Sequence, residues 1–175
     1  MSDEREPPWL QEPALEVVGW IVRGHLEAFG TPLLAGVEPW RASRLVAQEV
    51  FAADQAVLAH DGGADPRLIY ANATALRLWR RPWDAMVGLP SRRTAEPRER
   101  KARVEALALA RRQDGLRGYG GVRVDSGGRR FWMDGARLWL LRDGQGRERG
   151  QAATFSNWWW ISQRWDSCDL NRHPS

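Results

Sequence analysis

The residues that could carry nucleophilic or metal chemistry are few and lie far apart in this chain of 175 residues. There are three histidines, His25, His60 and His173, and one cysteine, Cys168. No H-x-x-x-H, H-E-x-x-H or Cys/His spacing of a metal site is present, and no serine stands in a G-x-S-x-G motif. We therefore interpret His60 as an ordinary residue near the end of a strand, and we expect no metal site.

Three further polar residues stand in patterned segments. Ser91 and Thr94 lie in a loop ahead of a helix, where a hydroxyl side chain caps a first turn. Asp134 stands alone in an otherwise apolar strand, where we expect it to pair with an arginine. No constellation of nucleophile and base supports catalysis. The chain is therefore expected not to be an enzyme, and a small hydrolase or isomerase is the least favoured alternative.

A glycine-rich stretch, with Gly118, Gly120 and Gly121, resembles a loop that cradles a phosphate. These glycines precede a strand and not a helix, so the context that a dinucleotide-binding loop requires is missing. A glycine inside a strand instead indicates a bulge or a close approach by another group. We favour an approach by the helix expected over residues 99–114, with a ligand as the alternative.

Arginines cluster around the loop and the start of that helix. We favour a solvated helix face shared with acidic residues, in which Glu99 and Arg103 have i, i+4 spacing. Attraction of an anionic ligand is the alternative. The arginines are Arg92, Arg93, Arg98, Arg100 and Arg103, and the acidic residues are Glu96, Glu99 and Glu105.

The formal net charge of +4 raises the question of a nucleic-acid partner. The 22 acidic residues are interspersed with the basic ones, and Lys101 is the only lysine, so we expect no such partner. One cysteine allows no intramolecular disulfide and fits a reducing compartment. The N-terminus lacks a signal-peptide pattern, and the apolar run at residues 17–22 is too short to span a membrane. We expect a cytoplasmic protein.

The elements that position these residues follow from hydrophobic periodicity. Residues 14–29 carry a helical apolar stripe that Gly30 ends, and a second helix is expected over residues 40–53. Beyond residue 54 the period changes. Strands are expected over residues 55–61, 67–72, 116–124, 129–141 and 149–158, with helical segments over 73–80, 83–88 and 99–114.

This order predicts an α+β domain: a five-stranded antiparallel sheet with short helices on one face, preceded by one or two N-terminal helices. Short glycine-containing turns join the last three strands into a meander. The sheet and its helices form a cup, which is a candidate small-molecule cavity. We divide the chain into a disordered N-terminus (1–13), an N-terminal helix and linker (14–39), the sheet domain (40–158) and a poorly ordered tryptophan-containing tail (159–175).

Several short motifs resemble a known family. They are YAN followed by a helix with LW, then GLPSR-x-TAEP, GVR-x-x-x-x-GRRFW and GQAATFS. Together these motifs resemble the MEKHLA domain, a PAS-related module, over roughly residues 15–158. The resemblance implies a PAS-like fold and a sensing or ligand-binding role. In plants a similar domain ends the class-three homeodomain leucine-zipper transcription factors, but this chain has neither a homeodomain nor a zipper, so a transcription-factor role is not carried over.

The resemblance also bears on cofactors. FWM, residues 131–133, is similar to the FWN motif of photoreceptor PAS domains, whose flavin-reactive cysteine lies in a GxNCRFLQ segment. That segment is absent here, and Cys168 lies outside the domain, so covalent flavin is disfavoured while non-covalent flavin stays open. Haem ligation needs a suitably placed histidine, and none lies in residues 99–114. Haem is disfavoured as well.

Alternation along residues 129–141 puts Phe131, Met133, Gly135, Arg137 and Trp139 on one face. Position-matching to FWN directs Met133 and Gly135 into the cup, and filling of the cup by tryptophans is the alternative. The leading hypothesis is a sensory module that binds an unidentified small molecule and modulates a partner. The alternative is a ligand-free interaction module that dimerises through helix 14–29. The residues expected to line the pocket are Tyr70, Trp79, Tyr119, Met133, Gly135 and Trp139.

Overall fold

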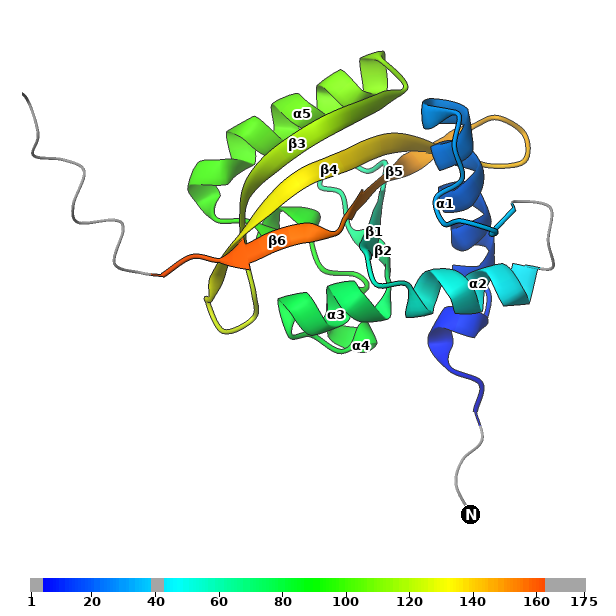
Figure 1. Ribbon diagram of the computed structural model, residues 1–175, viewed down its shortest axis with the longest axis horizontal. Coiled ribbons are helices and arrows are strands. Elements are labelled where there is room, and N and C mark those ends of the chain that lie inside the picture. Colours follow the sequence, from blue (N-terminus) through cyan, green and yellow to red (C-terminus); the bar gives the residue numbers. More distant parts are fainter. Residues whose placement is uncertain (1–4, 39–42, 163–175) are drawn as a thin grey trace, which may run out of the picture.

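An antiparallel sheet with strand order β2-β1-β5-β4-β3 forms the centre of the computed structural model, which describes residues 5–38 and 43–162 (Figure 1). The predicted meander is confirmed, because β4 pairs with both β3 and β5. Strand β1 pairs with β5, so the first and last parts of the domain meet in the sheet. The strands are β1 Ala56–Asp61, β2 Leu68–Ala71, β3 Gly115–Val124, β4 Arg130–Arg142, β5 Glu148–Phe155 and β6 Asn157–Trp160.

A sixth strand, β6, was not predicted as a separate element, although the strand expected over residues 149–158 includes its first two residues. It continues β5 along β4 in the same register, since Arg137 pairs with Thr154 and Asp134 pairs with Asn157. The two strands are separated only at Ser156. The tail expected to be poorly ordered from residue 159 onward therefore begins with the end of a strand, and residues 163–175 lie outside the described part of the chain.

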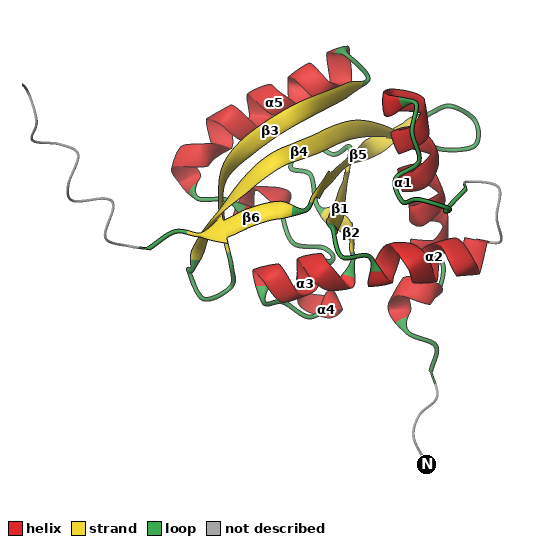
Figure 2. Ribbon diagram, in the orientation of Figure 1, coloured by secondary structure: helices red, strands yellow, loops and turns green. Residues whose placement is uncertain are grey.

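Helices cover both faces of the sheet (Figure 2). Helices α1 and α2 pack on one face, and α3, α4 and α5 pack on the other, so the expectation of short helices on one face holds for the segment between β2 and β3. Helix α1 ends at Gly30, whose left-handed backbone (φ 70°) lets its N–H donate to the carbonyl of Leu26. The helices are α1 Ala14–Phe29, α2 Ser43–Ala52, α3 Ala73–Trp79, α4 Trp83–Met86 and α5 Arg100–Arg112.

Asn72 connects three elements at the centre of the fold. Its side chain accepts from the N–H of Ala75, which caps α3, and from the N–H of Val57 in β1. Its amide group donates to the carbonyl oxygens of Val50 in α2 and Gln55. All four bonds come from a fully buried side chain, so this residue fixes the positions of α2, β1 and α3.

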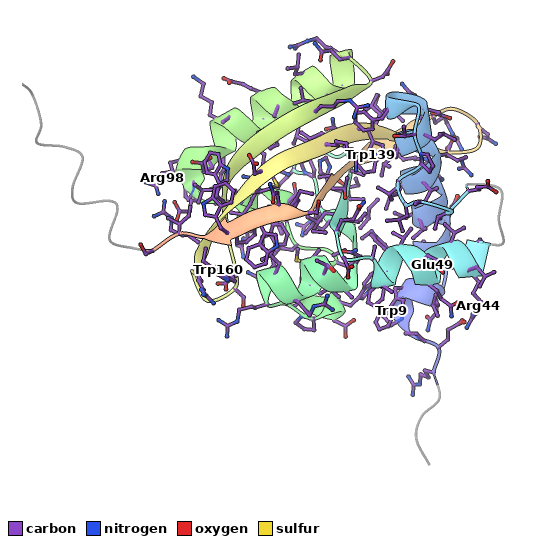
Figure 3. All side chains as sticks on the ribbon, in the orientation of Figure 1. Trp9, Arg44, Glu49, Arg98, Trp139 and Trp160 are labelled. Atoms are coloured by element: carbon purple, nitrogen blue, oxygen red, sulfur yellow. The ribbon has the colours of Figure 1, made fainter. Side chains whose placement is uncertain are left out.

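The core under α1 is filled by large apolar side chains. Trp139 of β4 is fully buried, packs against Gly24, and donates from its indole nitrogen to the carbonyl of Ile21 at 3.1 Å (Figure 3). A side chain on Gly24 would clash, because its Cβ would lie 2.6 Å from the carbonyl oxygen of Leu140. Helix α1 is therefore part of the domain core and does not lie outside it.

The N-terminal segment is more ordered than expected. Residues 1–13 were predicted to be disordered, but Pro8–Leu10 form a short 3-10 turn (η1) with Leu10 buried. The ring of Trp9 stacks on Phe51 of α2 with 3.9 Å between centroids. Aromatic burial thus holds this proline-containing segment against α2. Residues 1–4 lie outside the described part.

Candidate functional site

A small cavity of about 60 Å³ lies between the sheet and α5, on the face opposite α1. A buried water needs roughly 10–30 Å³, so the cavity matches a few waters or one ligand of a few non-hydrogen atoms. Pockets for drug-sized ligands are about 300–1,000 Å³, so a flavin does not fit this cavity. Its walls are Leu58, Ala59, His60, Leu68, Trp79, Ser91, Thr94, Arg103, Leu107, Tyr119, Arg123, Met133, Leu138, Gln151, Ala152 and Ala153.

Aromatic and sulfur-containing side chains form the apolar part of the wall. Trp79 of α3 is buried, meets Phe131 edge to face at 5.1 Å, and donates from its indole nitrogen to the carbonyl of Thr94 at 3.2 Å. Met133 of β4 is also buried. The ring contact and the indole hydrogen bond fix the position of Trp79 in the wall. The polar groups of the wall come from other residues.

Two arginines enter the same cavity from different elements. Arg123 of β3 is only 4% exposed, and its guanidinium donates to the hydroxyl of Tyr119 at 3.1 Å and to the carbonyl of Val122 at 2.9 Å. Arg103 comes from α5. Burial lowers the pKa of Arg103 to about 10, and the positive charge of Arg123 acts in the same direction. Two like charges thus face one small space.

Neither arginine has an ion pair with a carboxylate of the described residues. The expected i, i+4 pair between Glu99 and Arg103 does not form. The carboxylate of Glu99 lies near Gly121, where Arg123 also approaches: a Cβ on Gly121 would lie 3.4 Å from Oε2 of Glu99 and 3.0 Å from Nη1 of Arg123. Glu99 is therefore the carboxylate of the chain to be weighed as a counter-ion for Arg103 and Arg123.

His60 and Ser91 add two buried polar atoms without hydrogen-bond partners among the described residues. Nδ1 of His60 lies 2.7 Å from the carbonyl oxygen of Asp61, so it carries the proton and leaves Nε2 as an acceptor. Burial lowers the pKa of His60, which keeps the ring neutral. Ser91 is 1% exposed, and its hydroxyl has no partner. Unsatisfied buried groups are rare in native proteins and call for an explanation.

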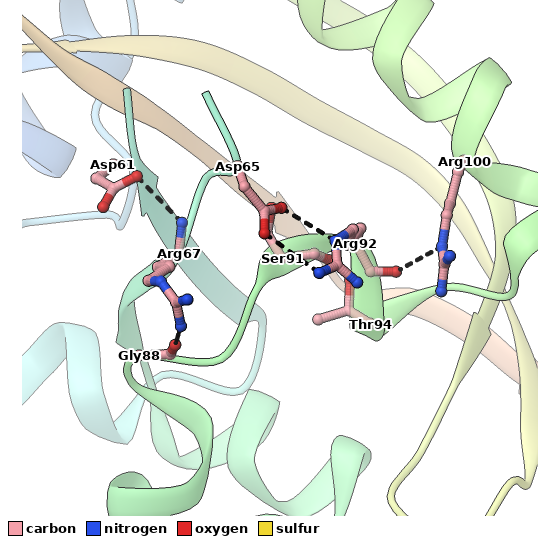
Figure 4. A network of polar contacts seen from close by, with 8 residues as sticks. All are labelled: Asp61, Asp65, Arg67, Gly88, Ser91, Arg92, Thr94 and Arg100. Carbon is pink, nitrogen blue, oxygen red and sulfur yellow. Dashed lines mark hydrogen bonds and ion pairs between the residues drawn. The ribbon is translucent and has the colours of Figure 1, made fainter. Parts of the chain in front are cut away.

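The caps expected from Ser91 and Thr94 do not form. Both residues lie in a 3-10 turn (η2, Ser91–Thr94), and the hydroxyl of Thr94 donates to the carbonyl of Ser91 at 2.8 Å (Figure 4). A one-turn segment with its own hydrogen bonds does not need a hydroxyl to cap it. A bidentate ion pair between Arg92 and Asp65 and a bond from Arg100 to the carbonyl of Arg92 hold this turn.

The arginines clustered in the sequence therefore have two different environments. Arg92 pairs with Asp65, and Arg98 pairs with Glu96 at 2.9 Å, as a solvated surface predicts. Arg103 instead lines the cavity. The solvated-face interpretation is wrong for this one residue, because position 103 lies on the side of α5 that faces the sheet.

Of the six residues predicted to line a pocket, Trp79, Tyr119 and Met133 lie in the wall of this cavity. Tyr70 and Trp139 do not. They belong to the core under α1, where Tyr70 pairs across strands with Ala59 and contacts the ring of Trp83. Gly135 is exposed and borders a separate shallow surface hollow.

A bulge at Gly135 explains the misplacement of Trp139. Met133 pairs with Gly121 but Ala136 pairs with Tyr119, and Gly135 has a φ of 62° that favours glycine. The alternation changes phase at this point, so Ala136 and Leu138 share the face of Met133 while Trp139 turns to α1. The signal was present in the sequence, since a glycine inside a strand marks a bulge.

The glycines of β3 match the expectation only in part, and Asp134 differs from it. Gly120 is approached by the ring of Trp132, where a Cβ would lie at 3.1 Å, and not by α5; Gly118 has open space and a φ of 72°. Gly121 is approached by Arg123 and by Glu99, the first residue of the helix expected over residues 99–114, so an approach from that segment is found at this glycine. Asp134 makes no ion pair within the described ranges.

Six polar wall residues were not among the residues predicted to line the pocket: His60, Ser91, Thr94, Arg103, Arg123 and Gln151. They come from five separate segments, and no spacing links them. Of these, only Arg103 belonged to the arginine cluster for which an anionic ligand was the alternative. In residues 5–38 and 43–162, no three His, Cys, Asp or Glu side chains are placed to hold a metal ion. Within the same residues, no helix is both long enough and apolar enough to cross a membrane.

Comparison with known proteins identifies the fold. The family model described as the MEKHLA domain matches residues 15–160. A search of curated protein sequences gives no match. A PAS domain from Colwellia psychrerythraea has a TM-score of 0.58 and 14% identity, covering 69% of this chain and 98% of its own.

Two light-oxygen-voltage proteins have the same fold. One, from a study of a flavin analogue, has a TM-score of 0.52 and 21% identity, covering 68% of this chain and 85% of its own. The other, an RNA-binding light-oxygen-voltage receptor, has a TM-score of 0.55 and 22% identity, covering 71% of this chain and 35% of its own. At these identities the likeness establishes the architecture alone.

Proposed function

The chain belongs to the MEKHLA domain family, and we propose that it is a PAS-like sensory module that binds a small molecule between the sheet and α5. Binding then changes a contact with a partner. The observation that carries this proposal is the cavity itself, where His60 Nε2 and Ser91 Oγ are buried without partners among the described residues. Leaving such a group unsatisfied costs about 1–3 kcal/mol, which a ligand would recover.

Helix α5 is the element that would respond to a ligand in the cavity. It contributes Arg103 and Leu107 to the cavity wall, and the amide of Gln151 in β5 donates to the carbonyl of Leu107 at 2.8 Å. Its contact with the sheet otherwise uses small side chains, Ala106 and Ala110. A ligand that orders Arg103 would therefore change how firmly α5 is held, and the outer side of α5 would report this to a partner.

We propose a binding module and not an enzyme. A serine nucleophile needs an adjacent base, and the hydroxyl of Ser91 has no hydrogen-bond partner among the described residues. The assignment to the cytoplasm stays a prediction.

Native mass spectrometry of the full chain, purified without added ligand, tests the proposal. We expect an adduct of small mass, or a rise in melting temperature with at least one compound from a library of small metabolites. A bare polypeptide mass together with no melting shift across the library would contradict it.

A second candidate, a ligand-free interaction module, is supported by strand β6. Trp159 is 52% exposed there and lies beside Trp132 with 6.4 Å between ring centroids. Exposed tryptophans are typical of interfaces. The apolar side of α1, by contrast, packs within the chain, so the reason for expecting dimerisation through helix 14–29 no longer holds. Size-exclusion chromatography with multi-angle light scattering of the full chain and of Trp159→Arg, at high concentration, tests a dimer: a monomer in both would exclude it.

A further inference from the structure

We propose that the ligand of this cavity is a small carboxylate anion held by Arg103 and Arg123. The inference rests on the proposed function, because it names the chemical class that the cavity would take. It follows from the charge, size and hydrogen-bonding groups of the wall.

The charged side chains of the cavity wall are all basic. Its residues include two arginines and a histidine but no aspartate or glutamate. Several arginines elsewhere in the described residues pair with carboxylates, for example Arg111 with Glu148 at 2.9 Å and Arg142 with Asp114 at 2.9 Å. Arg123 is buried and Arg103 is partly buried, and a buried charge without a counter-ion is unfavourable. An anion between the two guanidinium groups would supply the missing counter-charge.

Glu99 is the alternative counter-ion within the chain. It lies near Gly121 on the same side as Arg123, but it makes no ion pair with either arginine. It precedes α5 and is not part of the cavity wall. A carboxylate inside the cavity would lie between Arg103 and Arg123, whereas Glu99 does not line the cavity.

Size and shape favour a carboxylate over a larger anion. A volume of about 60 Å³ suits a few non-hydrogen atoms. The planar guanidinium group matches the two oxygens of a carboxylate. The remaining wall near Leu58, Met133 and Leu138 is apolar and suits a short alkyl group. A phosphate ester, with its additional oxygens, would place charge against these side chains.

His60 and Ser91 refine the class further. Nε2 of His60 is an acceptor, and the hydroxyl of Ser91 can donate or accept. A carboxylate that also carries a hydroxyl group would satisfy them, so glycolate should bind more tightly than acetate. Acetate and glycolate are the probes, and acetamide is the neutral match for acetate.

The test is thermal unfolding of the full chain at constant ionic strength with each of these three compounds. We expect saturable stabilisation by acetate, a lower apparent Kd for glycolate, and no shift with acetamide. Arg103→Met should raise the apparent Kd for acetate at least tenfold. The matched control is Arg111→Met on the same helix, which removes an exposed arginine and should leave the Kd unchanged. Melting of each variant without ligand reports whether it folds.

The outcomes separate the two proposals. Stabilisation by acetamide but not by acetate would overturn the anion and leave a ligand-binding module in place. Acetate binding that survives both Arg103→Met and Arg123→Gln would show that the anion binds elsewhere, which also overturns the inference. No shift with any probe, together with a negative metabolite library, would overturn both.

Discussion

The two faces of one sheet are built differently. On the α1 face, Trp139 and Tyr70 fill the space between β4, β2 and the helix, and the indole of Trp139 is hydrogen-bonded to Ile21. On the α5 face, β1, β3 and β5 present His60, Arg123 and Gln151 to a cavity. Neighbours in sequence, such as Leu138 in the cavity wall and Trp139 in the core under α1, therefore serve opposite purposes. Both faces hold buried polar atoms without hydrogen-bond partners among the described residues, but only those of the α5 face, Nε2 of His60 and the hydroxyl of Ser91, belong to residues of the cavity wall.

Removal of Trp139 should have the largest effect on stability. Trp139→Ala leaves a cavity under α1 and is expected to lower the free energy of unfolding by about 3–5 kcal/mol. Trp159→Ala, at a half-exposed position, is the matched control and should change it by less than about 1 kcal/mol. Urea denaturation measures both. Equal effects of the two substitutions would contradict the account of the α1 face as the main core.

Close packing of α1 on β4 makes the next prediction. Gly24→Ala puts a Cβ against Leu140 and Trp139, and overpacking of this kind costs about 1–3 kcal/mol. Gly19→Ala in the same helix meets only the end of Arg23 at 3.6 Å and should stabilise by up to about 1 kcal/mol through helix propensity. Thermal and urea unfolding give both values, and two effects of the same sign would argue against close packing at Gly24.

His25 on the α1 face should make the free energy of unfolding depend on pH. Burial lowers the pKa of His25 to about 4, which outweighs its hydrogen bond to the carbonyl of Thr31, and the charges of Arg137 and Arg117 act with burial. The unfolded chain takes up a proton below about pH 6.5 while the folded chain does not, so stability falls as pH falls from 6.5 toward 4.

The expected contribution of His25 is about 2 kcal/mol of stability lost between pH 7 and pH 4.5. His25→Gln retains a donor for Thr31 but has no titrating ring, so the loss over this range should be smaller by that amount. The pKa of His60 is lowered as well, so part of the dependence should persist in the variant. Urea titrations of the wild-type chain and of His25→Gln at the two pH values measure this difference. An equal loss of stability in both would exclude His25 as a source of the pH dependence.

Arg103 on the α5 face should matter least for stability. Because it has no ion pair among the described residues and faces Arg123, Arg103→Met is expected to change the free energy of unfolding by less than about 1 kcal/mol without ligand. A loss as large as that of Trp139→Ala would mean that Arg103 is structural, and the contrast between the faces would fail.

The fold was predictable where patterns are local. The apolar stripe of residues 14–29, the capping of α3 by Asn72 and the meander of β3, β4 and β5 all follow from neighbouring residues. The division at Ser156 and the extension of the last strand to Trp160 were missed, because they depend on pairing with residues 131–134 of β4, which no local pattern encodes.

The site was predictable only in part, and the bulge shows why. Strict alternation places Met133 and Trp139 on one face, but Gly135 changes the phase between them. Arg103 and Arg123 lie in separate segments, and only the packing of α5 on β3 brings their charges together. Tertiary contacts, and not residue spacing, decide which arginine is solvated and which faces the cavity.

The most direct test of the contrast is an NMR titration of the full chain with glycolate, using ¹³C-methyl methionine and ¹⁵N-indole tryptophan labels. Met133 and Trp79 line the cavity, whereas Trp139 lies across the sheet. We expect the Met133 methyl and the Trp79 indole signals to shift and saturate together while Trp139 stays in place. Saturable shifts at Trp139 without any at Met133 and Trp79, or no saturable shift at all, would contradict a ligand site on the α5 face.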